Sequence, residues 1–409
     1  MEIDIVAPFL FCHEGARPFP AVAGVRCGTG RGFSRACSTS VGVVLALGQA
    51  ECQARSPWAR LGPRYPHPTA HPQTTSPPKR WDNERVSALT PVLSSPGWEL
   101  LESLQAKQAV NPIPLPELGS ALRASGLDAE LVVAVLTQLA LRQDARAKFG
   151  PFASHMVFTR DGLEQATRLV VAARHAQRFR DCGASRVADL GCGIGSDAMA
   201  IAGLGMNVLA VDIDPDAAGA VAANLRAFEG SEVRLGDVTD LDMGELAAQG
   251  VDAIFADPAR RTGASRGSAR ITDPEQWSPP LSLALGWAST IDRVGIKVAP
   301  GIAYEHIPSS WHAQWVSVGG DLVEASLWSP ALSPEGSGRS CLLLDEAGAA
   351  HSLSTPEGFA PNAPAPRVEV APLGAMVAEP DSAVIRAGLL GRLADEVGAG
   401  IVSDKIAYL

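Results

Sequence analysis

The chain has 409 residues, of which 46% are hydrophobic and 19% charged, and its net charge is −10; this composition indicates a globular protein with room for two or three domains. No apolar run approaches the roughly 18 residues that span a bilayer, so we expect no membrane segment and no signal peptide. The seven cysteines form no C-x-x-C pair, which argues against a structural zinc site and suits a reducing cytoplasm.

Residues 1–85 differ in composition from the rest of the chain. They cluster Pro, Ser, Thr, His and Arg, and they carry a net charge of +4 against −14 for residues 86–409. Because they show no sustained strand or helix period, we expect them to be disordered. Two interpretations stay open: a native flexible tail, or a non-native extension translated from upstream of the true start.

Helical periodicity begins near residue 94. Apolar residues recur at helical spacing over residues 98–110, 116–124 and 128–147, which predicts a small N-terminal helical domain over residues 94–150. A further helix over residues 162–179 precedes the first strand and begins the second domain, predicted over residues 151–350.

The first motif lies over residues 186–197, where a strand ends at Asp189. Three glycines follow at a spacing of two: Gly191, Gly193 and Gly195. Glycine lets the backbone turn tightly and leaves no Cβ in the way of a ligand. A dinucleotide fingerprint has the different spacing G-x-G-x-x-G, and a carboxylate beside the loop suits a cation better than a pyrophosphate. Ser196 and Asp197 are candidate N-caps of the following helix.

Three further strands, over residues 206–211, 231–235 and 251–256, each end at an acid. The acids are Asp212, Asp237 and Asp257. Helical spacers separate the strands, which predicts a parallel α/β sheet with its ligand at the carboxyl ends. An acid at the tip of the second strand can accept hydrogen bonds from both ribose hydroxyls. Alternatively, each acid caps the helix or loop that follows it.

The acid and glycine loop resemble motif I of class I S-adenosylmethionine-dependent methyltransferases. The resemblance implies that S-adenosylmethionine is the cofactor and that Asp212 binds its ribose and Asp237 its adenine amino group. It also assigns cofactor binding to the loop residues Asp189, Gly191, Gly193 and Gly195. The alternative is an ordinary strand–turn–helix connection.

The fourth strand is followed by Asp257, Pro258, Ala259 and Arg260, a run that resembles motif IV, [DNS]-P-P-[YFW], of amino-group methyltransferases acting on nucleic acid. The resemblance implies that Asp257 and the carbonyl of Pro258 orient the acceptor amine. The sequence departs from that motif at Ala259 and at Arg260, which replaces the stacking aromatic residue. Arg260 and Arg261 are expected to contact substrate phosphate. Alternatively, Asp257 only caps the following loop.

Residues 158–167 resemble the segment that covers the cofactor in trimethylguanosine synthase-like enzymes, and this implies cofactor binding by Gln165. A plain amphipathic helix is the alternative. Lys297 ends a predicted strand over residues 295–298 near the site, and the alternative interpretation is a solvated strand end. His155 and His175 have no partner at metal-ligand spacing, so we expect both at the surface and no metal site.

The later segments continue the sheet. A helix is expected over residues 281–291, and strands over residues 313–318, 323–328 and 340–344 suit the antiparallel strands that close a methyltransferase sheet. Residues 351–365 read as a Pro-rich linker. A strand over residues 368–370 and one helix over residues 381–397, with Ile385, Leu389, Leu390 and Leu393 facing inward, are expected in a last domain over residues 366–409.

About residues 90–409 together resemble one bacterial family of class I methyltransferases with a C-terminal THUMP-like domain. Its signatures here are residues 148–150, 158–167, 189–195, 257–261 and 379–388. The resemblance implies an α/β, Rossmann-like sheet, an N-terminal helical domain and a small α+β THUMP-like domain that looks truncated at residue 409.

The expected function is S-adenosylmethionine-dependent methylation of an exocyclic amino group of an RNA base. RNA is implied only by analogy with THUMP domains, and the acidic net charge argues mildly against it. The alternatives are a methyltransferase acting on a small molecule or a protein, and a non-catalytic module that binds cofactor or RNA. We expect a cytoplasmic protein without membrane or metal partners.

Overall fold

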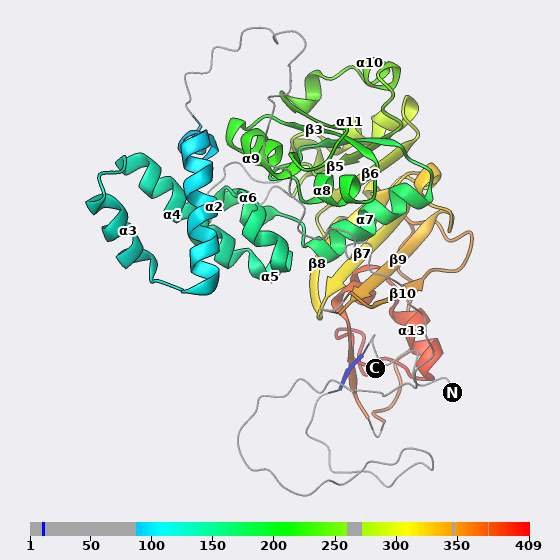
Figure 1. Ribbon diagram of the computed structural model, residues 1–409. Coiled ribbons are helices and arrows are strands. Elements are labelled where there is room, and N and C mark those ends of the chain that lie inside the picture. Colours follow the sequence, from blue (N-terminus) through cyan, green and yellow to red (C-terminus); the bar gives the residue numbers. More distant parts are fainter. Residues whose placement is uncertain (1–9, 13–86, 260–271, 346–347, 375) are drawn as a thin grey trace, which may run out of the picture.

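The structure is a computed structural model that describes residues 10–12, 87–259, 272–345, 348–374 and 376–409. A nine-stranded mixed sheet runs through it in the order β10-β9-β7-β8-β6-β5-β2-β3-β4, with helices on both faces (Figure 1). The expected disorder of residues 1–85 lies outside the described residues except for Leu10–Cys12, which form the short strand β1.

The parallel part of the sheet forms the predicted α/β arrangement. Its strands are β2 (Arg186–Leu190), β3 (Asn207–Asp212), β4 (Ser231–Leu235), β5 (Ala253–Ala256) and β6 (Arg293–Val298). The crossover helices are α8 (Ser196–Gly203), α9 (Pro215–Leu225), α10 (Met243–Ala248) and α11 (Leu281–Gly286). Because β3 and β5 lie on opposite sides of β2, the strand order switches there, and ligands of open α/β sheets bind outside such a switch point.

The remaining strands extend the sheet beyond β6. They are β7 (His312–Val318), β8 (Asp321–Trp328), β9 (Gly338–Leu344) and β10 (Ala350–Ser354). β8 is antiparallel to β6 and β7, as expected, but β9 pairs in parallel with β7. The antiparallel prediction was wrong for β9 because the chain leaving β8 crosses to the free edge of β7 and again runs in the direction of β7. β10 also occupies the first residues of the expected linker.

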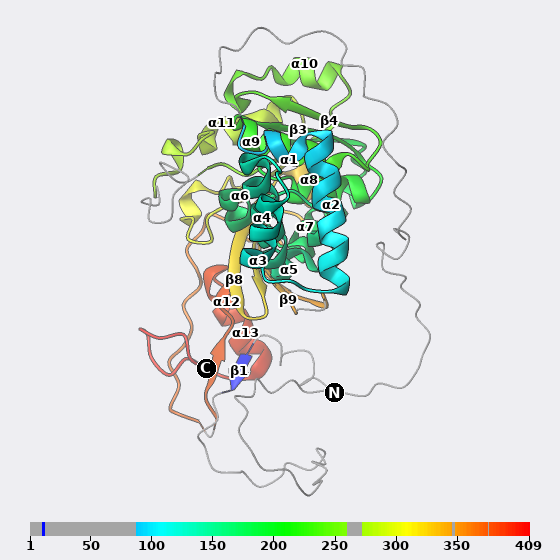
Figure 2. The same ribbon diagram turned by 60° about the vertical axis from the view of Figure 1, so that its left-hand side comes forward.

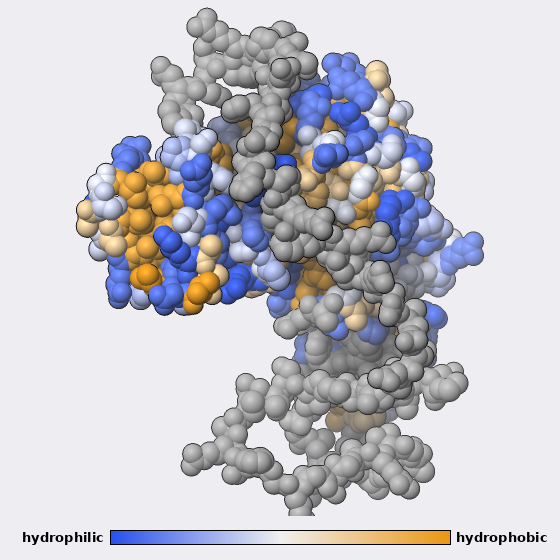
Figure 3. Space-filling model, in the orientation of Figure 1, coloured by the Kyte–Doolittle hydropathy of each residue, from blue (hydrophilic) through white to orange (hydrophobic). Residues whose placement is uncertain are grey.

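The helices N-terminal to the sheet form the cyan group at the left of Figure 1 and share a core with α8 and α9, which cover one face of the sheet. They are α1 (Thr90–Leu93), α2 (Ser95–Val110), α3 (Leu115–Ala124), α4 (Ala129–Asp144) and α5 (Arg146–Phe149). The same group shows an apolar surface at the left of Figure 3. Leu127 and Val133 are among the exposed hydrophobic residues of this part of the chain. α6 (Arg160–Gln165) and α7 (Leu169–Asp181) then lead into β2.

Side-chain alternation along the strands separates two cores, one on each face of the sheet. On β2, Ala188 and Leu190 join the core beneath α10 and α11, whereas Val187 joins the core beneath α7 and α8. β6 follows the same rule, with Ile296 and Val298 in the first core. Alternation therefore assigns Lys297 to the face beneath α7 and α8.

The predicted C-terminal helix differs from the structure in two respects. The expected single helix over residues 381–397 is two helices, α12 (Ser382–Arg386) and α13 (Leu390–Val397), because Gly388 takes a left-handed φ of 70° between them. Ile385 is 37% exposed rather than inward.

Residues 368–370 form no strand, although Val370 makes an isolated bridge with Ile401. β11 (Ala378–Pro380) pairs with β1 beside α13, as Figure 2 shows. Ala383, Val384 and Leu393 share the core of the large sheet, so the C-terminal segment packs against the sheet. No helix among the described residues is both long and apolar enough to cross a membrane.

Candidate active site

The glycine loop connects β2 to α8 at the carboxyl end of the sheet. Gly191, Gly193 and Gly195 have φ values of 79°, 55° and 85°, in the left-handed region that favours glycine. A Cβ on Gly195 would lie 2.4 Å from Cγ2 of Val221, whereas a Cβ on Gly193 would meet no atom of the described chain within 4 Å. Gly195 is therefore required for packing, and Gly193 borders open space.

The start of α8 corrects the cap prediction. Gly195 occupies the N-cap position and no side chain caps the helix there, so Ser196 and Asp197 are not N-caps. Both are instead buried in the first turn. Asp197 turns beneath the helix and contacts His175, its Oδ1 lying 2.8 Å from Nδ1 of the imidazole.

Two acids flank the glycine loop. Asp189 is 2% exposed, and its Oδ2 is buried without a hydrogen-bond partner among the described residues. Burial, together with the nearby charges of Asp197 and Asp257, raises the pKa of Asp189 well above its ordinary value. At the tip of β3, Asp212 accepts hydrogen bonds from the backbone N–H groups of Gly193 (2.8 Å) and Asp214 (2.9 Å). Burial raises the pKa of Asp212 as well.

The third acid, Asp237, follows β4 and is half-buried. Its Oδ1 accepts hydrogen bonds from the backbone N–H and the hydroxyl of Thr239, at 2.9 and 2.7 Å. Asp237 thus caps the short 3-10 turn Val238–Asp240. Asp237 therefore fits the alternative interpretation, in which a strand-ending acid caps the helix or loop that follows it. Its Oδ1 makes these two hydrogen bonds, which leaves Oδ2 for other contacts.

Asp257 follows β5 and forms an ion pair with Lys297, whose Nζ lies 2.6 Å from Oδ2. Lys297 is only 8% exposed, and its Nζ also donates to Oγ1 of Thr167 at 3.2 Å. The interpretation of Lys297 as a solvated strand end was therefore wrong. Burial lowers the pKa of Lys297, but the charges of Asp257, Glu324 and Asp197 outweigh burial and raise the pKa, so the side chain stays cationic.

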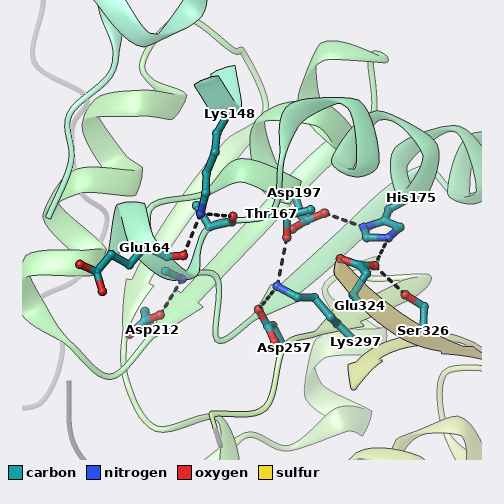
Figure 4. A network of polar contacts seen from close by, with 12 residues as sticks. Lys148, Glu164, Thr167, His175, Asp197, Asp212, Asp257, Lys297, Glu324 and Ser326 are labelled. Carbon is teal, nitrogen blue, oxygen red and sulfur yellow. Dashed lines mark hydrogen bonds and ion pairs between the residues drawn. The ribbon is translucent and has the colours of Figure 1, made fainter. Parts of the chain in front are cut away.

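A buried polar chain continues from this ion pair into the protein (Figure 4). It consists of Asp257, Lys297, Thr167, Asp197, His175, Glu324 and Ser326. His175 is 2% exposed, so its surface prediction was wrong, whereas His155 is exposed as expected. Nε2 of His175 lies 2.8 Å from Oε1 of Glu324. Burial lowers the pKa of His175, but Glu324 and Asp197 outweigh it and raise the pKa to about 10.

The expected cofactor lid is helix α6, which packs on the glycine loop. A Cβ on Gly162 of this helix would lie 2.3 Å from Cγ2 of Ile194, so the two segments are in close contact. Gln165 is the exposed last residue of α6.

Lys148, from α5, closes the carboxyl end of that helix. Its Nζ donates to the backbone carbonyls of Leu163, Glu164 and Ala166 at 2.7, 2.8 and 3.0 Å. Burial and the positive charges of Lys297 and Arg168 lower the pKa of Lys148 to about 8. In the sequence, Lys148 belongs to a family signature, and no local pattern indicates this capping role.

The loop after Asp257 is fixed where it leaves the sheet. Pro258 is buried, and Ala259 exchanges two backbone hydrogen bonds with Ser278, at 2.8 and 3.1 Å. Arg260 and Arg261, the predicted phosphate contacts, lie outside the described residues. No group of three or more His, Cys, Asp or Glu side chains in the described segments could hold a metal ion.

The residues at this edge of the sheet fit a nucleoside cofactor with a positive charge. Oδ2 of Asp189 is buried without a hydrogen-bond partner among the described residues, and a cation beside it would favour the ionised carboxylate. The open space at Gly193 allows a ligand to approach the backbone, and the adjacent Asp212 can accept hydrogen bonds from hydroxyl groups.

Comparisons with known proteins agree with this site. Residues 151–271 match the family described as methyltransferase small domain, and residues 85–145 match a domain of unknown function, DUF8688. An uncharacterized S-adenosylmethionine-dependent methyltransferase of Mycobacterium tuberculosis, present in two strains, is 30% identical over 284 residues, which cover 66% of this chain and 71% of the relative.

The fold is also that of a solved structure. A Porphyromonas gingivalis W83 protein assigned as a methyltransferase superimposes with a TM-score of 0.56 at 20% identity, covering 73% of this chain and 75% of the other. S-adenosylmethionine is accordingly the cofactor of this protein. The chain belongs to the S-adenosylmethionine-dependent methyltransferases.

Proposed function

We propose that this protein transfers a methyl group to an exocyclic amino group of an RNA base. The observation that carries the proposal is the position of Asp257, at the carboxyl end of β5 and beside the glycine loop: the Asp257 carbonyl oxygen would lie 3.2 Å from a Cβ on Gly191. Asp189, Asp212, Gly191, Gly193 and Gly195 form the cofactor side of the site, with Asp237 at the adenine and Gln165 at the lid. The site thus brings residues that would bind the methyl donor next to a carboxylate that would orient the acceptor amine.

The chemistry needs positioning rather than a covalent nucleophile on the protein. Bound S-adenosylmethionine supplies a methyl group on a sulfonium and leaves as a neutral thioether. Asp257 and the carbonyl of Pro258 accept the two N–H bonds of the acceptor amine, which turns its lone pair toward the methyl carbon. After transfer the acceptor nitrogen carries the positive charge, and it loses one proton to solvent.

RNA is proposed as the substrate for two reasons. The run from Asp257 to Arg260 resembles a motif of nucleic-acid amino methyltransferases, and Arg260 and Arg261 follow directly in the chain. An Arg can pair with a phosphate or stack on a base. A small-molecule or protein substrate is the competing proposal, because Arg260 stands where the motif has an aromatic residue.

The substrate class is tested with radiolabelled cofactor and separate RNA, protein and metabolite fractions from cells lacking this protein. We expect label in RNA, with binding that weakens steeply as salt rises. Label only in metabolites or protein contradicts the RNA assignment. Cofactor binding without labelling of any fraction indicates the non-catalytic module instead.

The role of Asp257 is tested with Asp257→Asn. We expect transfer to fall about 100-fold, in line with the loss of one oriented transition-state hydrogen bond, while cofactor affinity stays within about threefold. Asp292→Asn, at an exposed aspartate, is the matched control and should transfer normally. Full activity of Asp257→Asn contradicts the assignment.

A further inference from the structure

We propose that Lys297 is a positioning residue for Asp257: its ammonium fixes one carboxylate oxygen so that the other faces the acceptor amine. The inference rests on the proposed amine methylation and adds a residue to it. The ion pair joins Nζ to Oδ2 at 2.6 Å and leaves Oδ1 to accept from the substrate. The side chain of Asp257 is 32% exposed and that of Lys297 only 9%, so the pair has one accessible member.

Strand register brings the two residues together. β5 and β6 are parallel neighbours, and Ala256 pairs with Ile296. The next residues along each strand, Asp257 and Lys297, therefore emerge side by side at the carboxyl edge. The ammonium of Lys297, on β6, thereby reaches the carboxylate of the residue that directly follows β5.

A buried ammonium needs compensation, because removing it from water costs several kcal/mol. Here, besides Asp257, a series of buried polar side chains stabilises the ammonium of Lys297. Oγ1 of Thr167 accepts from the ammonium, and Thr167 in turn hydrogen-bonds Asp197. Asp197 is tied to His175, and His175 to Glu324 on β8. These contacts hold the ammonium from the side opposite Asp257.

The same arrangement links the cofactor side of the site to the acceptor side. Thr167 follows the lid helix α6, which packs on the glycine loop through Gly162 and Ile194. Lys297 therefore contacts one segment from the cofactor side and one carboxylate from the acceptor side. Misplacement of a reacting group by about 1 Å can cost about 100-fold in rate, so a carboxylate without this anchor should orient the amine poorly.

The experiment compares Lys297→Met, Lys297→Arg, Asp257→Asn and the double variant Asp257→Asn/Lys297→Met, using the labelled fraction as acceptor. We expect Lys297→Met to lower kcat about 100-fold with KM and cofactor affinity within about threefold. Lys297→Arg should restore part of kcat, because it restores the charge. The double variant should transfer no more slowly than Asp257→Asn alone, because Lys297 acts only through Asp257.

Two controls separate this role from a loss of folding. Lys107→Met changes an exposed lysine on α2 and should leave every reading unchanged. Thr167→Val removes one acceptor of the ammonium while keeping the volume of the side chain, and a smaller fall in kcat is expected. If Lys297→Met does not fold, Thr167→Val with unchanged kcat overturns the proposal.

The ion pair itself is observed without any substrate. The chain has five lysines, so a ¹⁵N spectrum of the lysine ammonium groups is simple, and the Lys297 signal is identified by its loss in Lys297→Arg. We expect a slowly exchanging Lys297 ammonium whose shift changes in Asp257→Asn. A rapidly exchanging signal, normal kcat in Lys297→Met, or equal losses of cofactor binding and transfer would overturn the inference. Failure of the wild-type protein to label any fraction would instead refute the proposed function itself.

Discussion

Gly193 and Gly195 share a left-handed backbone but differ in their surroundings. Forcing alanine into this conformation costs about 1–2 kcal/mol. At Gly195 the new methyl also collides with Val221, which adds about 1–3 kcal/mol of overpacking. At Gly193 the methyl would project into open space, where the cofactor would approach.

We therefore predict that two matched variants affect different properties, cofactor affinity in Gly193→Ala and the free energy of unfolding in Gly195→Ala. Gly193→Ala should lower cofactor affinity about tenfold or more, a loss of about 1.4 kcal/mol, and should lower the unfolding free energy only by the backbone strain of about 1–2 kcal/mol. Gly195→Ala should lower the unfolding free energy by about 2–5 kcal/mol. Titration calorimetry and thermal unfolding check the pair; equal affinities in Gly193→Ala and the wild type would contradict the position given to the cofactor.

His175 gives a prediction for pH. Its folded pKa of about 10 exceeds the unfolded value of about 6.5. The charged imidazole therefore stabilises the fold fully below about pH 6.5, and this contribution is lost as the pH rises through about 10. Long-range ¹H–¹⁵N spectra should show His175 doubly protonated at pH 8, with its signals identified by their loss in His175→Gln. A neutral ring at pH 8 would contradict this account.

Whether a site residue could be predicted from the sequence depends on how far along the chain its partners lie. The sequence located the acids at the strand tips because each ends its own apolar run, a local pattern. Lys297 and His175 were misjudged because all their partners are distant in sequence. Asp257 and Thr167 are 40 and 130 residues from Lys297. Asp197 and Glu324 are 22 and about 149 residues from His175. Their only local signal was position: a polar side chain on a buried face of a strand or helix needs buried partners.

At the scale of elements, helix α6, the proposed cofactor lid, depends on one lysine. Nζ of Lys148 satisfies three backbone carbonyls at the end of α6, a helix of only six residues that would be marginal without such contacts. Above pH 8 or so the neutral amine has only two N–H bonds for three carbonyls, because the pKa of Lys148 is lowered to about 8.

We predict that Lys148→Met loosens α6. Amide hydrogen exchange of Leu163 and Ala166, which bond to Thr159 and Gly162, should become several-fold faster, and cofactor affinity should fall. Lys107→Met is the matched control. Equal exchange in the two variants would show that α6 does not need the cap.

Periodicity predicted most elements, but not how they pair or where they break. The five parallel strands follow from apolar runs separated by helical spacers. The pairing of β9 with β7 could not be predicted, because the sequence does not show which edge a returning strand joins. The break between α12 and α13 rests on Gly388, where a Cβ would lie 3.0 Å from Nη2 of Arg339, a contact made only in the folded protein.

At the scale of the whole molecule, the two faces of the sheet carry cores with different contents. The core beneath α7 and α8 contains the buried polar chain, whereas the core on the other face joins α10 and α11 to the C-terminal helices. Arg339, on β9, lies over the ring of Tyr304 at 3.8 Å and donates to the carbonyl of Ala363 at 2.9 Å. These contacts connect the C-terminal segment to the sheet far along the chain from the glycine loop.

The central claim is that the cofactor lies at the carboxyl edge of the sheet, with its ribose on Asp212. Calorimetric titration of the wild type and Asp212→Asn with S-adenosylhomocysteine tests it most directly. Hydrogen bonds to a charged group contribute about 1.5–3 kcal/mol, so we predict one site in the wild type and binding about 10- to 100-fold weaker in Asp212→Asn. The free energy of unfolding should fall by about 1–3 kcal/mol, because the amide cannot accept from both Gly193 and Asp214. Equal affinity in the two proteins would contradict the account.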